Sequence, residues 1–341
     1  MREQIFVLEN YKSFNAKNIF ECGQCFRWNL EDDGSYTGVF GENVLNVLEK
    51  NKKIIFRGAC KESIIKTVID YFDLDTNYDK IKDELSKIDE NMKKSIEHGD
   101  GIRILNQDLW EMIISFIISA NNNIPRIKGI IEKISKEYGR VIEFNNKKYY
   151  TFPTPEELSV ASVEDLRKLG LGFRDKRVYE TTQLVLNGKV DLEKMKEIKD
   201  TSEVRKKLLE LPGVGPKVAD CVMLFALKKF DAFPIDVWVR RVMNDLYIKN
   251  EDETKVTKKQ IEQIAKDKYG NLAGIAQQYL FYWKREENKK VGWEEVLIST
   301  SFVLIVFVKT FLIFLQAKGI QYKQSIQITM NKQKVNLFFR K

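Results

Sequence analysis

The residues with the clearest chemical potential run from Leu211 to Cys221 and read LPGVGPKVADC. Gly213 and Gly215 can both adopt positive φ, so this segment can form a tight turn whose backbone N–H groups open toward the start of a helix. Such amides and the helix dipole bind phosphate without reading any base, because every nucleotide carries phosphate. A Gly-x-Gly turn is more often a plain connection, so the glycines alone do not establish a DNA site.

Lys217 adds a chemical function to this turn. It lies in the first turn of the predicted helix, where the helix dipole disfavours a cation, and a neutral amine is a nucleophile. Cys221 follows four residues later on the same helical face, although a small buried core residue is its simpler interpretation. Asp236 precedes another amphipathic stretch, where it can cap a helix and also face a cationic intermediate. Together these residues predict an enzyme that acts on DNA.

Five segments, in order over residues 1–288, resemble the 8-oxoguanine DNA glycosylase family of the helix-hairpin-helix superfamily. They are GQCFRW at 23–28, an asparagine triplet at 121–123, LGLGFR at 169–174, LPGVGPKVADC at 211–221 and GIAQQYLF at 274–281. One such motif is only a hypothesis, but five in the same order make coincidence improbable. In this superfamily the hairpin lysine separates members with lyase activity from purely hydrolytic ones. The resemblance therefore implies a bifunctional 8-oxoguanine glycosylase and abasic-site lyase.

The resemblance also implies a pocket for a damaged base that has been turned out of the duplex. Cys221 and Phe281 would sandwich this base, and Gln277 would bond its Watson–Crick edge. The carbonyl of Gly23 would accept a hydrogen bond from N7–H of 8-oxoguanine. Ordinary guanine has an acceptor at N7, so it would leave that carbonyl unpaired at a cost of about 1–3 kcal/mol.

On the DNA side, the resemblance implies that Asn121 fills the space left by the extruded base. Arg126 and Arg174 would hydrogen-bond the orphaned cytosine, and Phe173 would wedge beside it. The hairpin glycines and Trp238 would contact the DNA backbone. Phe173 stands where the family often has tyrosine, and Trp238 where many relatives have a phosphate-contacting histidine. Without the tyrosine hydroxyl, Phe173 keeps its stacking but loses a contact, which predicts weaker discrimination of the opposite base.

The implied reaction begins when Lys217 attacks C1′ and displaces the base, while Asp236 stabilises positive charge on the sugar and orients or deprotonates the amine. A Schiff base forms, and elimination of the 3′ phosphate gives the lyase activity. This scheme needs no metal or other cofactor. Two alternatives are a helix-hairpin-helix glycosylase for another damaged purine and a non-catalytic DNA-binding module, although such a module would need neither Lys217 nor Asp236.

The cysteines and the net charge limit the partners that we expect. The four cysteines are too scattered for the closely spaced quartet that holds an iron–sulfur cluster, so we expect none; they are Cys22, Cys25, Cys60 and Cys221. The net charge is +8, but residues 297–341 carry seven basic and no acidic residues, which leaves +1 for residues 1–296. Affinity for duplex DNA containing 8-oxoguanine must therefore come from a local patch.

The sequence patterns predict an α+β fold in three parts. Residues 1–95 alternate in segments such as CFRW, YTGVF and KKIIFRG, which predicts a small antiparallel β-sheet domain with a helix over 62–72. Residues 96–290 have helical periodicity, which predicts a two-lobed all-α glycosylase domain with an apolar, buried helix over 109–120. Residues 291–341 form an atypical apolar and basic tail.

The tail has two interpretations. Residues 296–315 contain a single charge, Lys309, and are long enough to span a bilayer. A lysine near the bilayer centre costs about 2.5–3.5 kcal/mol, so an aberrant or unstructured extension is preferred over a membrane anchor. The first twelve residues lack the long apolar core of a signal peptide. We expect a monomer in the cytoplasm, associated with the nucleoid if the source is bacterial.

Overall fold

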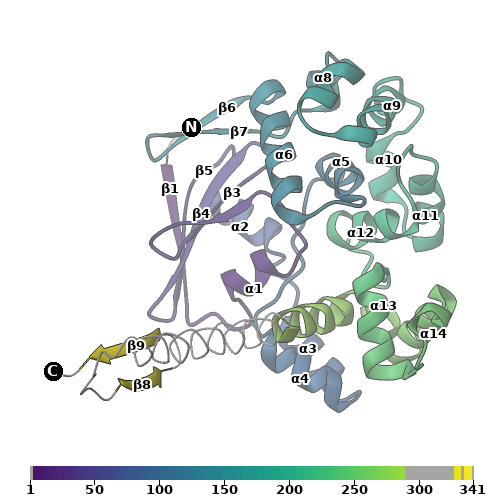
Figure 1. Cartoon of the computed structure of the whole chain (residues 1–341). Helices are drawn as coiled ribbons and strands as arrows, with labels where there is room; N and C mark the ends of the chain where they lie inside the picture. Colours follow the sequence, from purple (N-terminus) through teal and green to yellow (C-terminus); the bar gives the residue numbers. More distant parts are fainter. Residues whose placement is uncertain (1–2, 289–325, 332–333, 340–341) are drawn as a thin grey trace, which may run out of the picture. The chain divides into compact units, whose positions relative to one another are not determined.

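The structure, a computed structural model, describes residues 3–288, 326–331 and 334–339. By their internal contacts the residues divide into two units, Met1–Lys284 and Arg285–Lys341. The first unit contains an antiparallel sheet followed by helices (Figure 1), so the predicted α+β fold class is confirmed.

Five antiparallel strands form the sheet, in the spatial order β1-β5-β4-β3-β2. The strands are β1 (Glu3–Glu9), β2 (Trp28–Leu30), β3 (Tyr36–Phe40), β4 (Asn43–Lys50) and β5 (Lys53–Ala59). One face packs on α1 (Ala16–Glu21) and α2 (Ile64–Tyr71) through a buried cluster that includes Ile19, Val68 and Phe56. Burial of these apolar side chains drives the packing of the two helices on the sheet.

The prediction of a strand over CFRW is wrong except at Trp28, where β2 begins. The preceding residues bend because Gln24, which is fully buried, replaces the strand ladder with side-chain hydrogen bonds. Its Nε2 donates to the carbonyls of Ile19 and Arg103, and its Oε1 accepts from the backbone N–H of Leu105. A side chain that satisfies these backbone groups permits an irregular but ordered loop.

A second difference is the hairpin of β6 (Val141–Phe144) and β7 (Lys147–Tyr150), which lies in the region predicted to be helical. Ile142 and Phe144 on β6 pack with Val39, Val44 and Ala59 of the sheet. The hairpin therefore covers apolar sheet residues that are far from it in sequence, a long-range contact that helical periodicity does not reveal.

Helices form the rest of the first unit and enclose a second core. They are α3 (Tyr78–Ser86), α4 (Glu90–His98), α5 (Leu109–Ser119), α6 (Ile124–Tyr138), α7 (Pro155–Leu158), α8 (Val163–Lys168), α9 (Asp175–Leu186), α10 (Leu192–Glu197), α11 (Thr201–Leu209), α12 (Pro216–Ala226), α13 (Val237–Met243) and α14 (Lys258–Tyr269). Residues 273–288 are also helical. Ten of the eleven residues of α5 are buried, as its apolar sequence predicts, and α5 packs against α6, α9 and α12.

The second unit contains an antiparallel hairpin of β8 (Ile326–Asn331) and β9 (Lys334–Phe339), which the sequence analysis did not predict. The apolar segment 296–315 lies outside the described residues. In the part of the chain that the structure describes, no helix has both the length and the apolar character needed to cross a bilayer.

A buried carboxyl group links the GQCFRW loop to α5. Glu111 is 6% exposed, and burial raises its pKa to about 7, opposed by the charge of Arg27 and increased by that of Asp108. Arg27 is itself 8% exposed, and its Nε and Nη1 have no hydrogen-bond partner among the described residues. Glu111 is therefore an acid whose ionisation is disfavoured by the fold.

We expect the stability of this fold to fall as the pH rises through about 7. The pKa of Glu111 is raised in the folded state from the ordinary 4.5, so the stability that it contributes is complete below about pH 4.5 and is lost as the pH rises from there to about 7; the loss is about 3 kcal/mol. Glu111→Gln should remove much of this loss, measured as the free energy of unfolding in urea between pH 5 and 8.5. Glu132→Gln, an exposed control, should keep the wild-type slope. Equal slopes in both variants would contradict the assignment.

Candidate active site

The hairpin before α12 has one glycine with positive φ. Gly213 has φ +86°, and a Cβ built on it would lie 2.8 Å from Cδ of Arg177. Gly215 has φ −91° and ψ 178°, so the expectation of positive φ there is wrong: it adopts the extended backbone of an N-cap residue, followed by Pro216 in the first turn of α12. The turn therefore depends on glycine most strongly at Gly213.

Lys217 extends from the first turn of α12 toward α5. Its side chain is half-buried, and its Nζ lies 5.1 Å from the ring centroid of Phe116. The same ring lies 5.4 Å from Phe26 of the GQCFRW loop and 5.7 Å from Phe225 of α12. Phe116 thus joins the loop, α5 and α12 beside the amine, and the sequence analysis missed it because it is one apolar residue among many in α5.

Cys221 lies near both Lys217 and Asp236. The thiol is 4% exposed, and burial raises its pKa to about 11; the charge of Lys217 opposes this rise, whereas those of Asp220 and Asp236 increase it. The structure therefore brings the predicted nucleophile, the predicted carboxylate and this thiol into one neighbourhood. At neutral pH Cys221 is an uncharged thiol, which suits a contact with a flat, neutral base.

Asp236 is the N-cap of α13, and its Oδ1 accepts a hydrogen bond of 2.7 Å from the backbone N–H of Val239. The cap fixes one oxygen of the carboxylate. No other hydrogen bond or ion pair to Asp236 is found among the described residues, so its second oxygen is available to a substrate. Trp238 on the same helix is half-buried, and its Nε1 is buried without a partner in the described structure.

The helical residues 273–288 carry Gln277 and Phe281. Gln277 is 4% exposed, and Phe281 packs on the core cluster that also contains Cys221. The helix approaches the segment before Asp236 closely, since a Cβ on Gly274 would lie 2.5 Å from the carbonyl oxygen of Ala232. The glycine of GIAQQYLF therefore permits the contact that places these side chains. Gly23 has φ +94° and precedes the anchored Gln24.

Three asparagines form the loop between α5 and α6, and each has a different role. Asn121 is exposed and has φ +51°, a conformation that asparagine tolerates well. Asn122 donates from Nδ2 to the carbonyl of Ile118, and Asn123 caps α6 by accepting from the backbone N–H of Arg126. The loop geometry thus follows from short-range asparagine hydrogen bonds, and it presents Asn121 at the surface.

Arg126, Phe173 and Arg174 lie near this loop. Arg126 is exposed and donates from Nη2 to the carbonyl of Gly170, 3.2 Å away. Phe173 is 55% exposed. Arg174 is only 2% exposed, and its guanidinium donates to the carbonyls of Ala120, Asn121 and Leu171. Of the two predicted base-contacting arginines, only Arg126 extends into solvent.

Comparison with known proteins identifies the family. The model of the 8-oxoguanine DNA glycosylase N-terminal domain matches residues 6–113, and that of the HhH-GPD superfamily of base excision DNA repair proteins matches residues 114–269. A crystal structure of the Clostridium acetobutylicum 8-oxoguanine glycosylase/lyase with DNA is similar, with 41% identity and a TM-score of 0.79 over 84% of this chain and 98% of that one. The chain belongs to the 8-oxoguanine DNA glycosylase family.

Two curated relatives support the assignment of this chain to the family. A probable N-glycosylase/DNA lyase of Methanothermobacter thermautotrophicus is 34% identical over 57% of this chain and 66% of its own length. The N-glycosylase/DNA lyase of Saccharomyces cerevisiae is 33% identical over 66% of each chain. The family resemblance inferred from the five motifs is confirmed.

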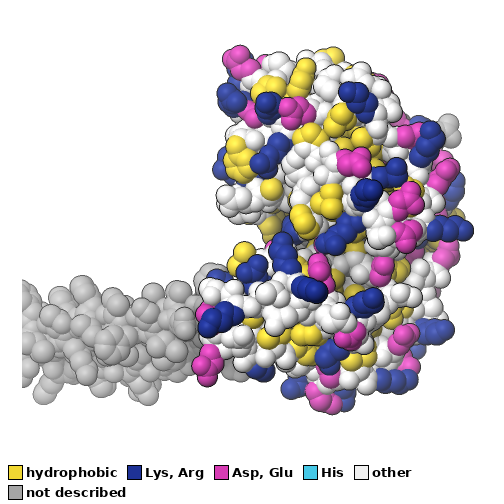
Figure 2. Space-filling model, turned by 90° about the vertical axis from the view of Figure 1, so that its right-hand side faces the viewer, with side chains coloured by type: hydrophobic (Ala, Val, Ile, Leu, Met, Phe, Trp, Pro, Cys, Tyr) yellow, Lys and Arg dark blue, Asp and Glu magenta, His cyan; other side chains and the backbone are white. Residues whose placement is uncertain are grey.

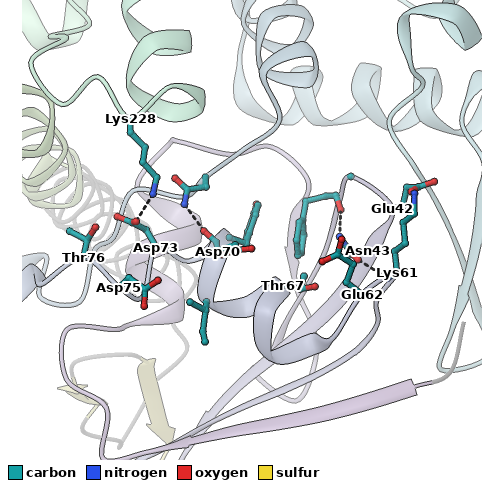
Figure 3. Close-up of a pocket in the computed structure, with 15 residues that line it drawn as sticks. Glu42, Asn43, Lys61, Glu62, Thr67, Asp70, Asp73, Asp75, Thr76 and Lys228 are labelled. Atoms are coloured by element: carbon teal, nitrogen blue, oxygen red, sulfur yellow. Dashed lines mark hydrogen bonds and ion pairs between the residues drawn. The ribbon is translucent and has the colours of Figure 1, made fainter. Parts of the chain in front are cut away.

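A pocket of about 720 Å³ lies elsewhere in this glycosylase (Figure 3). It is lined by α2, the loop that follows it and the β3–β4 turn, and contains none of the predicted site residues. Lys228 and Asp73 pair across 2.7 Å, and Lys61 pairs with Glu42. This pocket is therefore separate from the candidate site residues on α12 and α13.

The two hairpin glycines provide a matched test of this site. Gly213→Ala should lower the free energy of unfolding by about 1–3 kcal/mol and weaken duplex DNA binding, because the new Cβ is strained at φ +86° and meets Arg177. Gly215→Ala should change stability far less, since its φ is negative and no heavy atom lies within 4 Å of its built Cβ. Chemical denaturation and fluorescence anisotropy measure both effects. Equal effects in the two variants would refute this assignment of the turn.

Proposed function

We propose that this protein is a base-excision-repair enzyme that removes 8-oxoguanine from duplex DNA and then cleaves the strand 3′ to the abasic site. The curated relatives are named N-glycosylase/DNA lyase, the enzyme class that the sequence predicts. The Clostridium structure contains duplex DNA with cytosine opposite 8-oxoguanine, which supports DNA as the partner. The observation that carries the proposal is a half-buried lysine at the start of α12, directed at the ring of Phe116 and sharing the neighbourhood of Asp236.

In the proposed reaction, the amine of Lys217 forms a bond to C1′ as the bond from C1′ to the base breaks, and the base leaves with the proton that the amine loses. The N-capping Asp236 uses its second oxygen to stabilise the positive charge that develops on the sugar. Ring opening gives a Schiff base on Lys217. Loss of a proton from C2′ then expels the 3′ phosphate, and water releases the lysine.

The extruded base would lie between Cys221 and Phe281, with Gln277 at its Watson–Crick edge. Gln277 already accepts a hydrogen bond of 3.1 Å from Nε2 of Gln278, which orients its amide before DNA binds. The carbonyl of Gly23 would accept the N7–H that distinguishes 8-oxoguanine from guanine. The anchored Gln24 holds this glycine in place, so the loop contributes a fixed acceptor.

In the duplex, Asn121 would enter the space left by the extruded base, and Phe173 would wedge beside the orphaned cytosine. Arg126 would hydrogen-bond the orphaned cytosine. Arg174 would join it by exchanging carbonyl partners for the base, and Trp238 would contact the DNA backbone. We further propose that the enzyme acts as a cytoplasmic monomer without an iron–sulfur cluster.

Borohydride trapping tests the nucleophile. Wild-type protein incubated with an 8-oxoguanine duplex and borohydride should form a covalent complex that is visible on a denaturing gel. Lys217→Gln should lose trapping entirely while retaining duplex binding, because it removes the amine and leaves the hairpin intact. Lys206→Gln, an exposed lysine on α11, should trap normally. Trapping that persists in Lys217→Gln would eliminate this residue as the nucleophile.

A panel of lesion duplexes tests the substrate. Duplexes that contain 8-oxoguanine, 3-methyladenine, a mismatched purine or undamaged guanine would be assayed with and without alkaline treatment. We expect excision of 8-oxoguanine and strand cleavage without alkali, with guanine excised at least ten-fold more slowly because it leaves the Gly23 carbonyl unpaired. Preferential excision of an alkylated purine, with cleavage only after alkali, would favour the alternative glycosylase.

A further inference from the structure

Arg177 has no role in the scheme above, yet it is one of two arginines over the ring of Phe173. The Cζ atoms of Arg174 and Arg177 lie 4.2 Å and 5.3 Å from the Phe173 ring centroid. Burial lowers the pKa of Arg174, and the positive charges of Arg126 and Arg177 lower it further. Two guanidinium groups therefore lie over one exposed aromatic ring, and a third, that of Arg126, lies near enough to act on Arg174.

The three guanidinium groups differ in how many hydrogen bonds they make within the protein. The guanidinium of Arg174 has five N–H donors. It makes four contacts with backbone carbonyl oxygens inside the protein. Arg126 makes one hydrogen bond to a carbonyl. Arg177 is exposed, and among the described residues it has neither a hydrogen bond nor a carboxylate partner. Of the three arginines, Arg177 therefore has the fewest polar interactions within the described part of the protein.

Two basic residues near Arg177 do have carboxylate partners. Lys176, the preceding residue, pairs with Glu180 at 3.7 Å, and Arg167 pairs with the buried Asp175 at 2.6 Å. These partners neutralise charge on the same helix and its neighbour. Figure 2 shows that basic side chains over the helical lobe are interspersed with acidic and apolar ones, so a strong positive site must be local.

The stem of Arg177 fixes where its charge can act. Cδ and Cβ of Arg177 pack on the Cα of Gly213, and they would lie only 2.8 and 3.1 Å from a Cβ at that position. Thr181, one turn later on α9, donates from Oγ1 to the carbonyl of Pro212 at 3.2 Å. The stem thus rests on the hairpin while the guanidinium lies over Phe173, between two segments assigned to DNA contact.

We propose that Arg177 binds a backbone phosphate of the DNA between the hairpin and Phe173. The inference rests on the proposed function, because it takes the hairpin and Phe173 as DNA contacts. A guanidinium binds phosphate through charge-assisted, paired N–H donors, and here no carboxylate has to be displaced first. Phosphate is common to all sequences, so this contact strengthens duplex binding without reading the opposite base.

The test compares Arg177→Met with Lys176→Met in the full chain. Methionine keeps an apolar stem against Gly213 and removes the charge, whereas the control removes an equal charge that Glu180 already neutralises. The probe is a duplex with a tetrahydrofuran abasic-site analogue, titrated by anisotropy at several salt concentrations opposite each of the four bases. Arg177→Met should weaken binding about five- to ten-fold for every opposite base and reduce the slope of log K against log salt by about one.

Arg177→Lys should restore most of the slope, because the contact depends on charge, and thermal melting of each variant checks folding. Affinity and slope in Arg177→Met equal to those of Lys176→Met would overturn the inference, as would a loss confined to one opposite base. Excision of 8-oxoguanine by the wild type is measured in parallel. If the wild type binds but does not excise, the proposed function fails while the phosphate contact is still decided by the titration.

Discussion

The packing of α12 against α5 sets where the amine of Lys217 lies. Lys217 stands in the first turn of α12, and the ring of Phe116, 5.1 Å from its Nζ, gives the lysine stem an apolar surface. Phe26 and Phe225 hold that ring from two other segments. Core packing therefore fixes the ring beside which the Lys217 amine lies.

A second constraint is that loops around the site are fixed by side-chain to backbone hydrogen bonds. Gln24 anchors the GQCFRW loop, Asn122 and Asn123 shape the α5–α6 loop, and Asp236 caps α13. Each bond satisfies backbone groups that would otherwise be unpaired in an irregular segment. The loops that carry the candidate site residues are therefore ordered by hydrogen bonds within the fold.

Much of this fold was predictable from local patterns. The apolar run of α5, the helix after the sheet and the hairpin at 211–221 all follow from periodicity, glycine placement and capping residues. The strand prediction failed at CFRW because a long-range partner, the 103–105 segment, satisfies Gln24. The β6–β7 hairpin was missed for the same kind of reason, since its apolar face is complementary to sheet residues about 100 positions earlier.

The sequence by itself determined the chemical character of the protein: a lysine after a glycine hairpin, a capping aspartate downstream and five motifs in the order of the 8-oxoguanine glycosylases. These features are local, because φ preferences, caps and helical faces depend on residues a few positions apart. Only the tertiary structure decided that Phe116 faces Lys217, that Arg174 is enclosed by carbonyls and that Arg177 has no carboxylate partner among the described residues. Burial and pairing of an ionisable group depend on which distant segments surround it, and local pattern does not encode that arrangement.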